Sequence, residues 1–376
     1  MTDADLETEA QGFAKELVAP AAAAWSLGAA PAMGLFERAG ALGLLAVEVP
    51  RHAGGLGLGF AAKVRAAEAI AAVDFGFAMA LINTQNVALR LVKSAAPEVW
   101  QPILPDLLTG RASACTALTE PGAGSDFGAI TTTARREGDG WLLDGEKTWI
   151  INARHAALSI VYAQCGDIGD RDGIGAFIVP LNSPGCRRYP LHTPFSLTSM
   201  GTGGFRFEGV LLPADHLLFA PGEAFGAILD EINGARAYVA ALCCAMLAAA
   251  IEEAGEYGES RESFGRPLAR HQAWRLQLAR AGVDLAAARA LTDRAIAAVD
   301  TGAPAQMLAA QAKIAAVEIC RQRLPELLHL MGAEGLRAER CFSRHLAAAE
   351  IAALTDGSTE MLLERLHRLM RREPQP

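Results

Sequence analysis

The sequence predicts an α+β protein in which a helical region, a β region and a second helical region follow one another. Two observations indicate this order. Apolar residues recur at helical spacing near both ends, as for Phe60, Val64 and Ala67 at i, i+4 and i+7. Between them, short β-branched runs alternate with turn residues, which indicates an antiparallel sheet rather than a series of βαβ units. The expected domains are residues 1–114, 115–220 and 221–376.

The first region is predicted to be all helical, with one break. Pro50 to Gly59 is a glycine-rich stretch that fits a loop between two packed helices. It does not carry the strict Gly-x-Gly-x-x-Gly spacing after a strand that a dinucleotide site requires. We therefore expect no dinucleotide fold of that kind here.

The β region is predicted from short apolar and β-branched runs. Gly138-Asp139-Gly140 is expected to turn the chain, and Asp144-Gly145 has the composition of a further type I′ hairpin turn. The expected strands are residues 130–134, 141–143, 158–163, 174–179 and 205–212.

The last region is predicted to form a bundle of long helices rich in Ala and Leu, because small side chains let helices approach closely. Leu362, Leu366 and Leu369 lie on one face of the final helix. The expected helices are residues 225–257, 271–300, 303–330, 343–353 and 358–370.

Composition excludes several classes of function. The chain has 376 residues, of which 34 are basic and 42 acidic, a net charge of −8, with no basic run that would favour nucleic acid. The acidic start, Met1 to Glu7, does not resemble a targeting segment, and the longest apolar run, from Ala237 to Ile251, is short for a membrane span. These features predict a soluble cytoplasmic protein.

The cysteines and histidines do not predict a metal site. The seven cysteines contain no Cys-x-x-Cys, and the eight histidines contain no His-Glu-x-x-His. Cys243 and Cys244 are adjacent on an apolar helix. We expect all seven cysteines to be buried small side chains in a reducing compartment.

The stretch most suggestive of a ligand is Thr119 to Asp126, Thr-Glu-Pro-Gly-Ala-Gly-Ser-Asp. Its small residues leave backbone N–H groups accessible, so a flat or anionic ligand can approach closely. Taken alone, the same residues would also fit an ordinary surface turn with a capping serine.

Three further motifs follow that stretch in order, and the four together resemble the acyl-CoA dehydrogenase superfamily of flavoenzymes. The motifs are Lys147-Thr148-Trp149-Ile150-Ile151-Asn152, Arg261-Glu262-Ser263-Phe264-Gly265 and Asp356-Gly357-Ser358-Thr359-Glu360. The resemblance covers nearly the whole chain. It implies an all-α N-terminal domain, a central antiparallel β-barrel-like domain and a C-terminal four-helix bundle.

The resemblance also implies FAD as the cofactor. Trp149 resembles the aromatic residue that shields the flavin ring, although a core residue on a β face is the alternative. Arg261 and Phe264 resemble a pair that reaches the flavin of a neighbouring subunit, which implies a homodimer or homotetramer; Arg261 would otherwise be an ordinary exposed cation. The residues implied in cofactor binding are Thr119, Gly124, Ser125, Trp149, Ile151, Arg261, Phe264, Gln272, His329, Gly332, Ser358 and Glu360.

The implied reaction is α,β-dehydrogenation of an acyl thioester carried by coenzyme A or by an acyl-carrier protein. A carboxylate removes the α-proton, and the β-hydrogen leaves as hydride to flavin N5. Asp356 stands where most of the family has a glutamate base, whereas Ala235 occupies the alternative base position. A cap near the start of the last helix is the other reading of Asp356. Ser125, Asn233 and Arg236 match positions near the substrate.

The sequence departs from the family at three places. Asp356 is one methylene, about 1.5 Å, shorter than glutamate, and a displacement of about 1 Å can slow a reaction about 100-fold. Ile151 replaces a hydroxyl residue that bonds flavin N5. Ala347-Ala348 replaces an Arg-Asp pair, so we expect polar contacts to be lost there.

These departures leave two alternatives beside the dehydrogenase. Asp is the base in the related nitroalkane oxidases, which favours a flavin oxidase that reduces oxygen. Ile151 and Ala347-Ala348 favour a non-catalytic partner subunit that completes a neighbour's flavin site. For the dehydrogenase, the electron acceptor is expected to be a protein such as an electron-transfer flavoprotein.

Overall fold

The computed structural model describes residues 1–191, 195 and 197–371. Compactness divides the chain into two units, each described here by itself. The first unit comprises residues 1–9, 30–63 and 79–231, and the second comprises residues 10–29, 64–78 and 232–376.

The N-terminal region is helical, as predicted. The predicted face of α4 is confirmed, since Phe60, Val64 and Ala67 are all buried. The loop predicted around Gly55 is also present, and a side chain at Gly55 would overlap the backbone of Val49. The helices are α1 (Asp3–Phe13), α2 (Ala19–Ser26), α3 (Met33–Ala41), α4 (Phe60–Ala71), α5 (Phe75–Ser94), α6 (Pro97–Trp100) and α7 (Leu104–Thr109), with a π-helical turn at Ala14–Val18.

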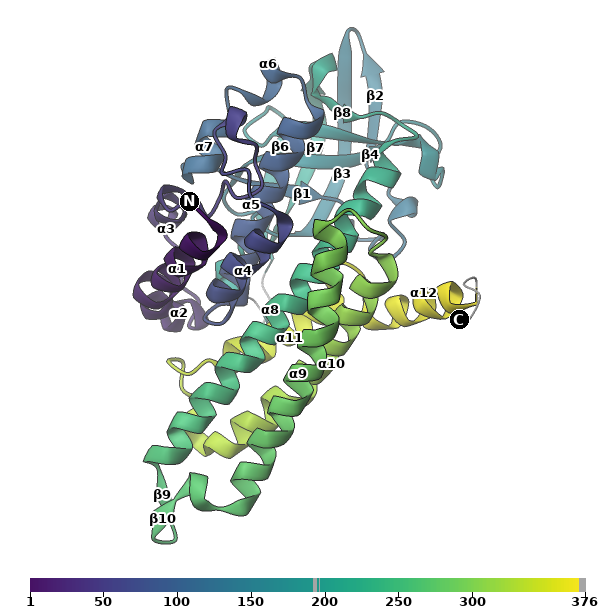
Figure 1. The fold of residues 1–376 in the computed structure, drawn as a ribbon. Helices are drawn as coiled ribbons and strands as arrows, with labels where there is room; N and C mark the ends of the chain where they lie inside the picture. The colour runs from purple at the N-terminus through teal and green to yellow at the C-terminus, as the bar shows by residue number, and fades with distance from the viewer. Residues whose placement is uncertain (192–194, 196, 372–376) are drawn as a thin grey trace. The chain divides into compact units, whose positions relative to one another are not determined.

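The first unit contains an eight-stranded sheet with the order β6-β7-β3-β2-β4-β5-β8, and β1 pairs with β4 (Figure 1). Four of the five predicted strands are present, and the strand predicted at residues 130–134 instead begins at Thr133 and runs to Glu137; β1, β6 and β8 were not among the predictions. The strands are β1 (Ser113–Ala117), β2 (Thr133–Glu137), β3 (Gly140–Ile150), β4 (Ala156–Gln164), β5 (Ile174–Pro180), β6 (Cys186–Pro190), β7 (Gly203–Leu212) and β8 (Leu217–Phe219).

Two expectations for the sheet need correction. The sheet is mixed, because β1 pairs with β4 in parallel and the segment between them contains β2 and β3. The hairpin turn lies at Gly138-Asp139, as predicted, but Asp144-Gly145 is not a turn. These two residues lie within β3 at an irregularity in its pairing with β7, where the Asp144 carboxylate accepts a hydrogen bond from the Gly209 N–H at 2.6 Å. Gly145 is needed because a Cβ there would meet Thr132.

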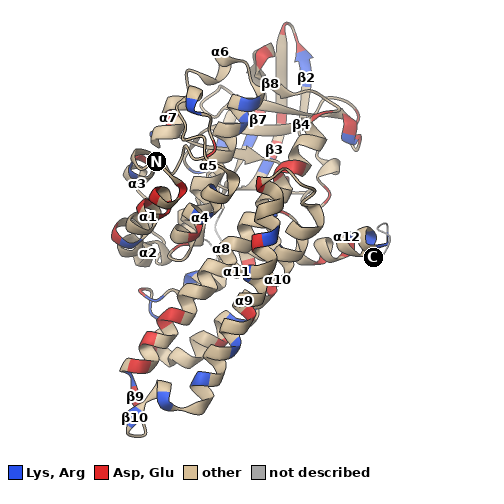
Figure 2. Cartoon of the chain, viewed as in Figure 1, with Lys and Arg blue, Asp and Glu red and all other residues tan. Residues whose placement is uncertain are grey.

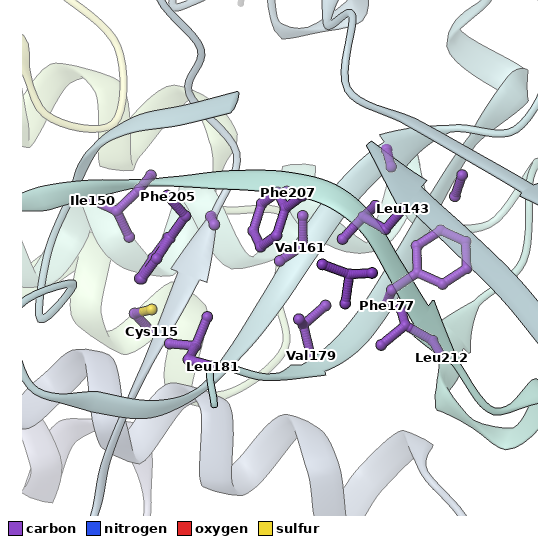
Figure 3. Close-up of a cluster of buried hydrophobic side chains, with 14 of the residues drawn as sticks. Cys115, Leu143, Ile150, Val161, Phe177, Val179, Leu181, Phe205, Phe207 and Leu212 are labelled. Atoms are coloured by element: carbon purple, nitrogen blue, oxygen red, sulfur yellow. The ribbon is translucent and has the colours of Figure 1, made fainter. Parts of the chain in front are cut away.

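A buried apolar cluster joins the strands of this sheet. Side chains from β1, β3, β4, β5 and β7 contribute to it, including Phe177, Phe205 and Phe207 (Figure 3). Trp141 packs edge-on against Phe177, with ring centroids 5.1 Å apart. Because several strands share this cluster, the sheet forms a rigid scaffold for its loops.

The second unit contains the predicted C-terminal helices. Within it, α9, α10 and α11 run alongside α8 as a bundle (Figure 1). The cores of the predicted helices are confirmed, and their ends differ by a few residues. The elements are α8 (Ala224–Ser260), β9 (Glu262–Ser263), β10 (Arg266–Pro267), α9 (Gln272–Asp300), α10 (Gln306–Met331), α11 (Phe342–Leu354) and α12 (Thr359–Met370).

Among the described residues, α8 alone has the length and composition of a membrane-crossing helix, and 78% of its most apolar stretch is buried within the protein. The core helix of a bundle has the same properties. Lys and Arg are interspersed with Asp and Glu along the helices and strands (Figure 2).

All seven cysteines are free thiols. Five are buried, including Cys243 and Cys244 on α8. The expectation of full burial is wrong for Cys165 and Cys186, which are half-buried. Burial raises the pKa of Cys115 to about 12 and that of Cys244 to about 11, so these thiols are protonated at neutral pH.

Candidate active site

The loop from Thr119 to Asp126 leaves β1 in the first unit and is fixed at its base. The Thr119 carbonyl accepts a hydrogen bond from the Thr148 N–H on β3 at 2.9 Å. The loop then closes on itself, because Glu120 and Ala123 exchange two backbone hydrogen bonds, at 2.9 and 3.2 Å. These hydrogen bonds hold the backbone between Thr119 and Ala123.

A buried ion pair underlies this loop. Lys147 Nζ lies 2.7 Å from Glu120 Oε1, and these side chains are 0% and 2% exposed. Glu120 also accepts hydrogen bonds from the backbone N–H groups of Thr131 and Thr132, at 2.6 and 2.9 Å. Lys147 donates a second hydrogen bond to the Leu118 carbonyl at 2.9 Å. The ion pair therefore links Glu120 in the loop to Lys147 on β3.

The outer surface of the loop is bare. A Cβ on Gly122 or on Gly124 would meet nothing within 4 Å. Neither glycine has a positive φ, so neither packing nor backbone conformation requires glycine at these positions. Ser125 is exposed and Thr119 is half-buried. Glycine here keeps the peptide surface accessible, which fits a flat ligand lying against the backbone.

Trp149 and Ile151 follow at the end of β3. The alternative that Trp149 is a core residue on a β face is wrong, because its side chain is 57% exposed. Ile151 is half-buried. Beside them, Asn152 is buried and donates from its amide to the carbonyls of Ala80 and Ala114, at 2.7 and 3.1 Å. Asn152 therefore anchors the segment that presents Trp149.

Backbone strain coincides with the candidate residues. Among the described non-glycine residues, positive φ angles occur at Trp149 (60°), Asn152 (65°), Phe264 (52°) and Asp356 (54°). This region disfavours bulky side chains such as Trp and Phe, and each such residue costs on the order of 1–3 kcal/mol. Such strain clusters at functional sites, which supports a role for these residues beyond folding.

In the second unit, the motif around Arg261 forms the hairpin β9–β10 that joins α8 to α9. Phe264 and Gly265 occupy its turn, with φ angles of 52° and 74°. Positive φ at both central residues defines a type I′ turn, for which Asn-Gly is preferred over Phe-Gly. Phe264 is 96% exposed at the tip, and Arg261 is also exposed. An apolar side chain held in this position fits a contact with another molecule.

The remaining predicted flavin contacts lie on the surface of the second unit. Gln272 is exposed at the first position of α9, and His329 is exposed in the last turn of α10. Gly332 ends α10 with φ 60° and ψ −147°, a conformation that only glycine adopts readily. All three residues are exposed and so accessible to a ligand, and His329 and Gly332 lie together at the end of α10.

Asp356 lies in the loop between α11 and α12, at φ 54°, and Gly357 follows at φ 102°. Its backbone carbonyl accepts a hydrogen bond from Arg236 Nε at 3.0 Å. Arg236 in turn donates to Asn233 Oδ1, one turn earlier on α8, at 3.0 Å. Arg236 and Asn233, predicted near the substrate, are therefore brought together with the candidate base.

The cap at the start of α12 is Ser358, not Asp356. The Ser358 hydroxyl accepts a hydrogen bond from the Met361 N–H at 3.3 Å. Glu360 is exposed in the first turn, where hydrogen bonds to the Glu360 backbone and Ser358 lower its pKa. Because Ser358 performs the capping, the helix does not account for the carboxylate of Asp356.

A lysine that the motifs did not indicate also contacts this loop. Lys313 on α10 is only 1% exposed, and its ammonium donates to the Gly357 carbonyl at 2.6 Å. Burial lowers the pKa of Lys313 to about 8, although the charge of Asp356 opposes this. Burial likewise lowers the pKa of Arg236 to about 10. A lone lysine on an Ala-rich helix gives no signal in a sequence, so only the structure identifies it.

The departure at Ala347-Ala348 lies on α11, and Ala348 is fully buried. On the same helix, Arg344 donates to the Val73 carbonyl at 2.7 Å. The buried His345 imidazole hydrogen-bonds the Ala72 carbonyl at 3.1 Å. Polar contacts of α11 are therefore made by Arg344 and His345 one turn before the two alanines.

The fold and the site residues define a flavoenzyme of the acyl-CoA dehydrogenase type. The chain matches three family models in succession: acyl-CoA dehydrogenase N-terminal domain over residues 2–111, middle domain over 115–210 and C-terminal domain over 222–370. It belongs to the acyl-CoA dehydrogenase family, whose members are oxidoreductases that act on the CH–CH group of acyl-CoA. The predicted fold and enzyme class are thus confirmed.

Particular relatives agree with this assignment. The human mitochondrial short-chain specific acyl-CoA dehydrogenase is 33% identical over 327 residues, 86% of this chain and 79% of that protein. The structure of butyryl-CoA dehydrogenase from Megasphaera elsdenii is 26% identical, with a TM-score of 0.93 and 99% of both chains covered. A glutaryl-CoA dehydrogenase from Mycobacterium smegmatis in complex with FADH2 is also 26% identical, with a TM-score of 0.92, covering 99% of this chain and 95% of that one.

Proposed function

We propose that this protein is an FAD-dependent dehydrogenase that introduces an α,β double bond into an acyl thioester, with Asp356 as the base. The observation that carries the proposal is the Asp356 loop. Its carboxylate belongs to a residue at strained φ, held by buried cations, while Ser358 performs the structural task of capping α12. Backbone strain of this kind clusters at functional sites, which supports a role for Asp356 in the reaction.

The residues of the first unit fit a flavin. Its ring would lie against the bare backbone around Gly124 and the exposed face of Trp149, and the hydroxyls of Thr119 and Ser125 would hydrogen-bond its polar edge. Arg261 and Phe264 would serve the flavin of a neighbouring subunit in a homodimer or homotetramer, with Gln272 and His329 as further contacts. Bound flavin supplies the hydride acceptor of the reaction.

Asp356 supplies the proton chemistry in this proposal. Its carboxylate takes the proton α to the thioester carbonyl as the β-hydrogen leaves with its electron pair. The neighbouring charges of Arg236 and Lys313 favour the ionised carboxylate that this step requires. The shorter reach of aspartate restricts the reaction to substrates whose α-carbon approaches the loop closely.

An oxidase is the second candidate, favoured by the aspartate itself. A protein of that kind would oxidise a substrate with a more acidic C–H group, such as a nitroalkane, and would transfer the electrons from that substrate to oxygen. For the dehydrogenase we propose an electron-transfer flavoprotein as acceptor, coenzyme A or an acyl-carrier protein as carrier, and a cytoplasmic location.

The visible spectrum of the purified protein tests these proposals. We expect a yellow protein whose absorbance is bleached anaerobically by members of a panel of acyl-CoA and acyl-carrier-protein thioesters that includes butyryl-CoA. Bleaching only by a nitroalkane, with peroxide formed in air, would establish the oxidase. A colourless protein that does not bind added FAD would refute both and support the partner-subunit alternative raised by Ile151.

The base assignment requires its own variant. Asp356→Asn should retain FAD and lose flavin reduction by at least about 1,000-fold, in keeping with loss of an essential proton acceptor. Glu364→Gln, which alters an exposed carboxylate on the adjacent helix α12, is the matched control and should reduce at the normal rate. Unchanged reduction in Asp356→Asn would rule out Asp356 as the base.

A further inference from the structure

The Asp356–Gly357 loop is held by two buried cations that contact consecutive carbonyl groups. Arg236 Nε donates to the Asp356 carbonyl at 3.0 Å, and Lys313 Nζ donates to the Gly357 carbonyl at 2.6 Å. Both side chains are almost fully buried, at 2% and 1% exposure. We call Arg236 and Lys313 the two-cation clamp.

The loop needs such a clamp because of its conformation. Asp356 and Gly357 both have positive φ, a sequence of angles that is costly for Asp356. Hydrogen bonds from charged donors are roughly twice as strong as neutral ones, so two of them can hold a strained turn. Gly357 is required in turn by its φ of 102°, which residues with a Cβ rarely adopt.

We propose that Lys313 is a positioning residue for the reaction: its ammonium fixes the backbone of the base loop and keeps the Asp356 carboxylate ionised. This inference rests on the proposed function of Asp356. Arg236 also supports the loop, but Lys313 is the first of the two to lose its charge as the pH rises, since its pKa is about 8 and that of Arg236 about 10. Lys313 thereby links the loop to pH.

Titratable groups approach Lys313 from three elements. Asp356 faces it from the base loop, Arg236 and the Cys243 thiol from α8, and Glu360 from α12. Burial, the largest influence, lowers the pKa of Lys313 to about 8. As the pH rises through that value the ammonium deprotonates, the charge beside Asp356 disappears, and the hydrogen bond to Gly357 weakens. Below that value the clamp is complete.

The test compares three variants by stopped-flow reduction of the bound flavin, between about pH 6 and 9, with the thioester that reduces the wild type fastest. Lys313→Gln keeps a donor without the charge, Lys313→Met removes both, and Lys313→Arg keeps the charge at every pH used. Glu318→Gln, an exposed residue on α10, is the matched control. The melting temperature and flavin content of each variant are recorded alongside.

In wild type we expect reduction to slow above about pH 8. In the neutral variants Lys313→Gln and Lys313→Met, the profile of reduction rate against pH should show no fall above about pH 8, and the rate at neutral pH should be about tenfold lower. The acid limb of the profile, where the rate falls as the pH drops, should move upward by about one pH unit, as expected for loss of a nearby opposite charge. Lys313→Arg should keep the acid limb and lose the alkaline one. Wild-type pH profiles in Lys313→Gln and Lys313→Met would overturn the inference, and if Lys313→Met does not fold, Lys313→Gln decides.

Hydrogen exchange of the protein without substrate gives a second measurement that does not depend on turnover. Peptides covering residues 354–362 should exchange faster in Lys313→Met than in Lys313→Arg at the same pH, and equal protection would count against the clamp. Asp356→Asn separates the two proposals. If that variant still reduces the flavin, the proposed function fails; if it does not, while the Lys313 variants behave as wild type, only the clamp fails.

Discussion

Removal of Lys147 is expected to destabilise the protein by about 3–5 kcal/mol, the usual result of breaking a buried ion pair from one side. Lys147→Met keeps the approximate length of the side chain and deletes its charge. Glu120 then remains buried as a carboxylate, held by the N–H groups of Thr131 and Thr132. The Leu118 carbonyl loses its hydrogen bond at the same time.

The pKa values of both partners reflect the same interaction. Burial alone would raise the pKa of Glu120, but the charge of Lys147, with hydrogen bonds from Lys147 and Thr132, lowers it from 4.5 to about 2. Burial lowers the pKa of Lys147 to about 8, although the charge of Glu120 opposes this. Each partner therefore favours the charged form of the other, and removal of one leaves the other charge buried without compensation.

The assay is a double-mutant cycle on urea unfolding, with Glu120→Gln, Lys147→Met and the double variant. We expect the double variant to be less destabilised than the sum of the single ones, by about 2 kcal/mol or more, because it leaves no buried charge. Lys93→Met, at an exposed position on α5, is the control and should change stability by less than about 0.5 kcal/mol.

The pH dependence has a definite sign. Because the folded pKa of Glu120 lies below its ordinary value of 4.5, its contribution is complete above about pH 4.5 and is lost as the pH falls toward 2. The difference in free energy of unfolding between wild type and Glu120→Gln should therefore become smaller as the pH falls toward 2. This account of the pair would be refuted if the destabilisation in the double variant equalled the sum of those in the single variants. It would also be refuted if the difference in free energy of unfolding between wild type and Glu120→Gln stayed constant down to low pH.

Three further predictions concern strain, access and acid stability. Trp149→Gly should raise the melting temperature by a few degrees, because about 1–2 kcal/mol of backbone strain is relieved, and should weaken FAD binding in a titration; a lower melting temperature would contradict the strain argument. Gly124→Val should leave the melting temperature within about 2 °C of wild type while abolishing FAD retention, since the position faces open space; retained yellow colour would show that the ligand lies elsewhere. Burial and the charge of Arg344 lower the pKa of His345 to about 3, so the fold favours the neutral imidazole. The free energy of unfolding should therefore fall as the pH drops from 6.5 toward 3. His345→Gln should reduce this fall, and an unchanged slope of the free energy of unfolding against pH would exclude His345 as its source.

The sequence predicted the elements better than their contacts. Helical periodicity located α8 to α12 within a few residues, because that signal is local. The parallel pairing of β1 with β4 depends on residues more than forty positions apart, and no local pattern encodes it. Asp144-Gly145 had the right composition for a turn, but pairing with β7 on both sides kept it within a strand.

For the candidate site, the sequence identified several residues but neither their backbone conformation nor all of their neighbours. Trp149, Phe264 and Asp356 were found through motifs, whereas their strained backbone could not be, because φ follows from the surrounding fold. Lys313 carries no motif, and its proposed role depends on the loop that it contacts across the bundle. Motif spacing thus identified candidate site residues, whereas the contact of Lys313 with this loop could be found only in the structure.

The cap at Ser358 bears on how the loop before α12 would respond to substitution. Ser358 starts α12, and Arg236 and Lys313 donate to the backbone carbonyls of Asp356 and Gly357, so these contacts do not depend on which side chain stands at residue 356. The charge of Asp356 does matter to its surroundings, because it favours the protonated forms of the buried Arg236 and Lys313. A different side chain at this position would therefore keep the backbone contacts of the loop while changing the charge that faces two buried cations.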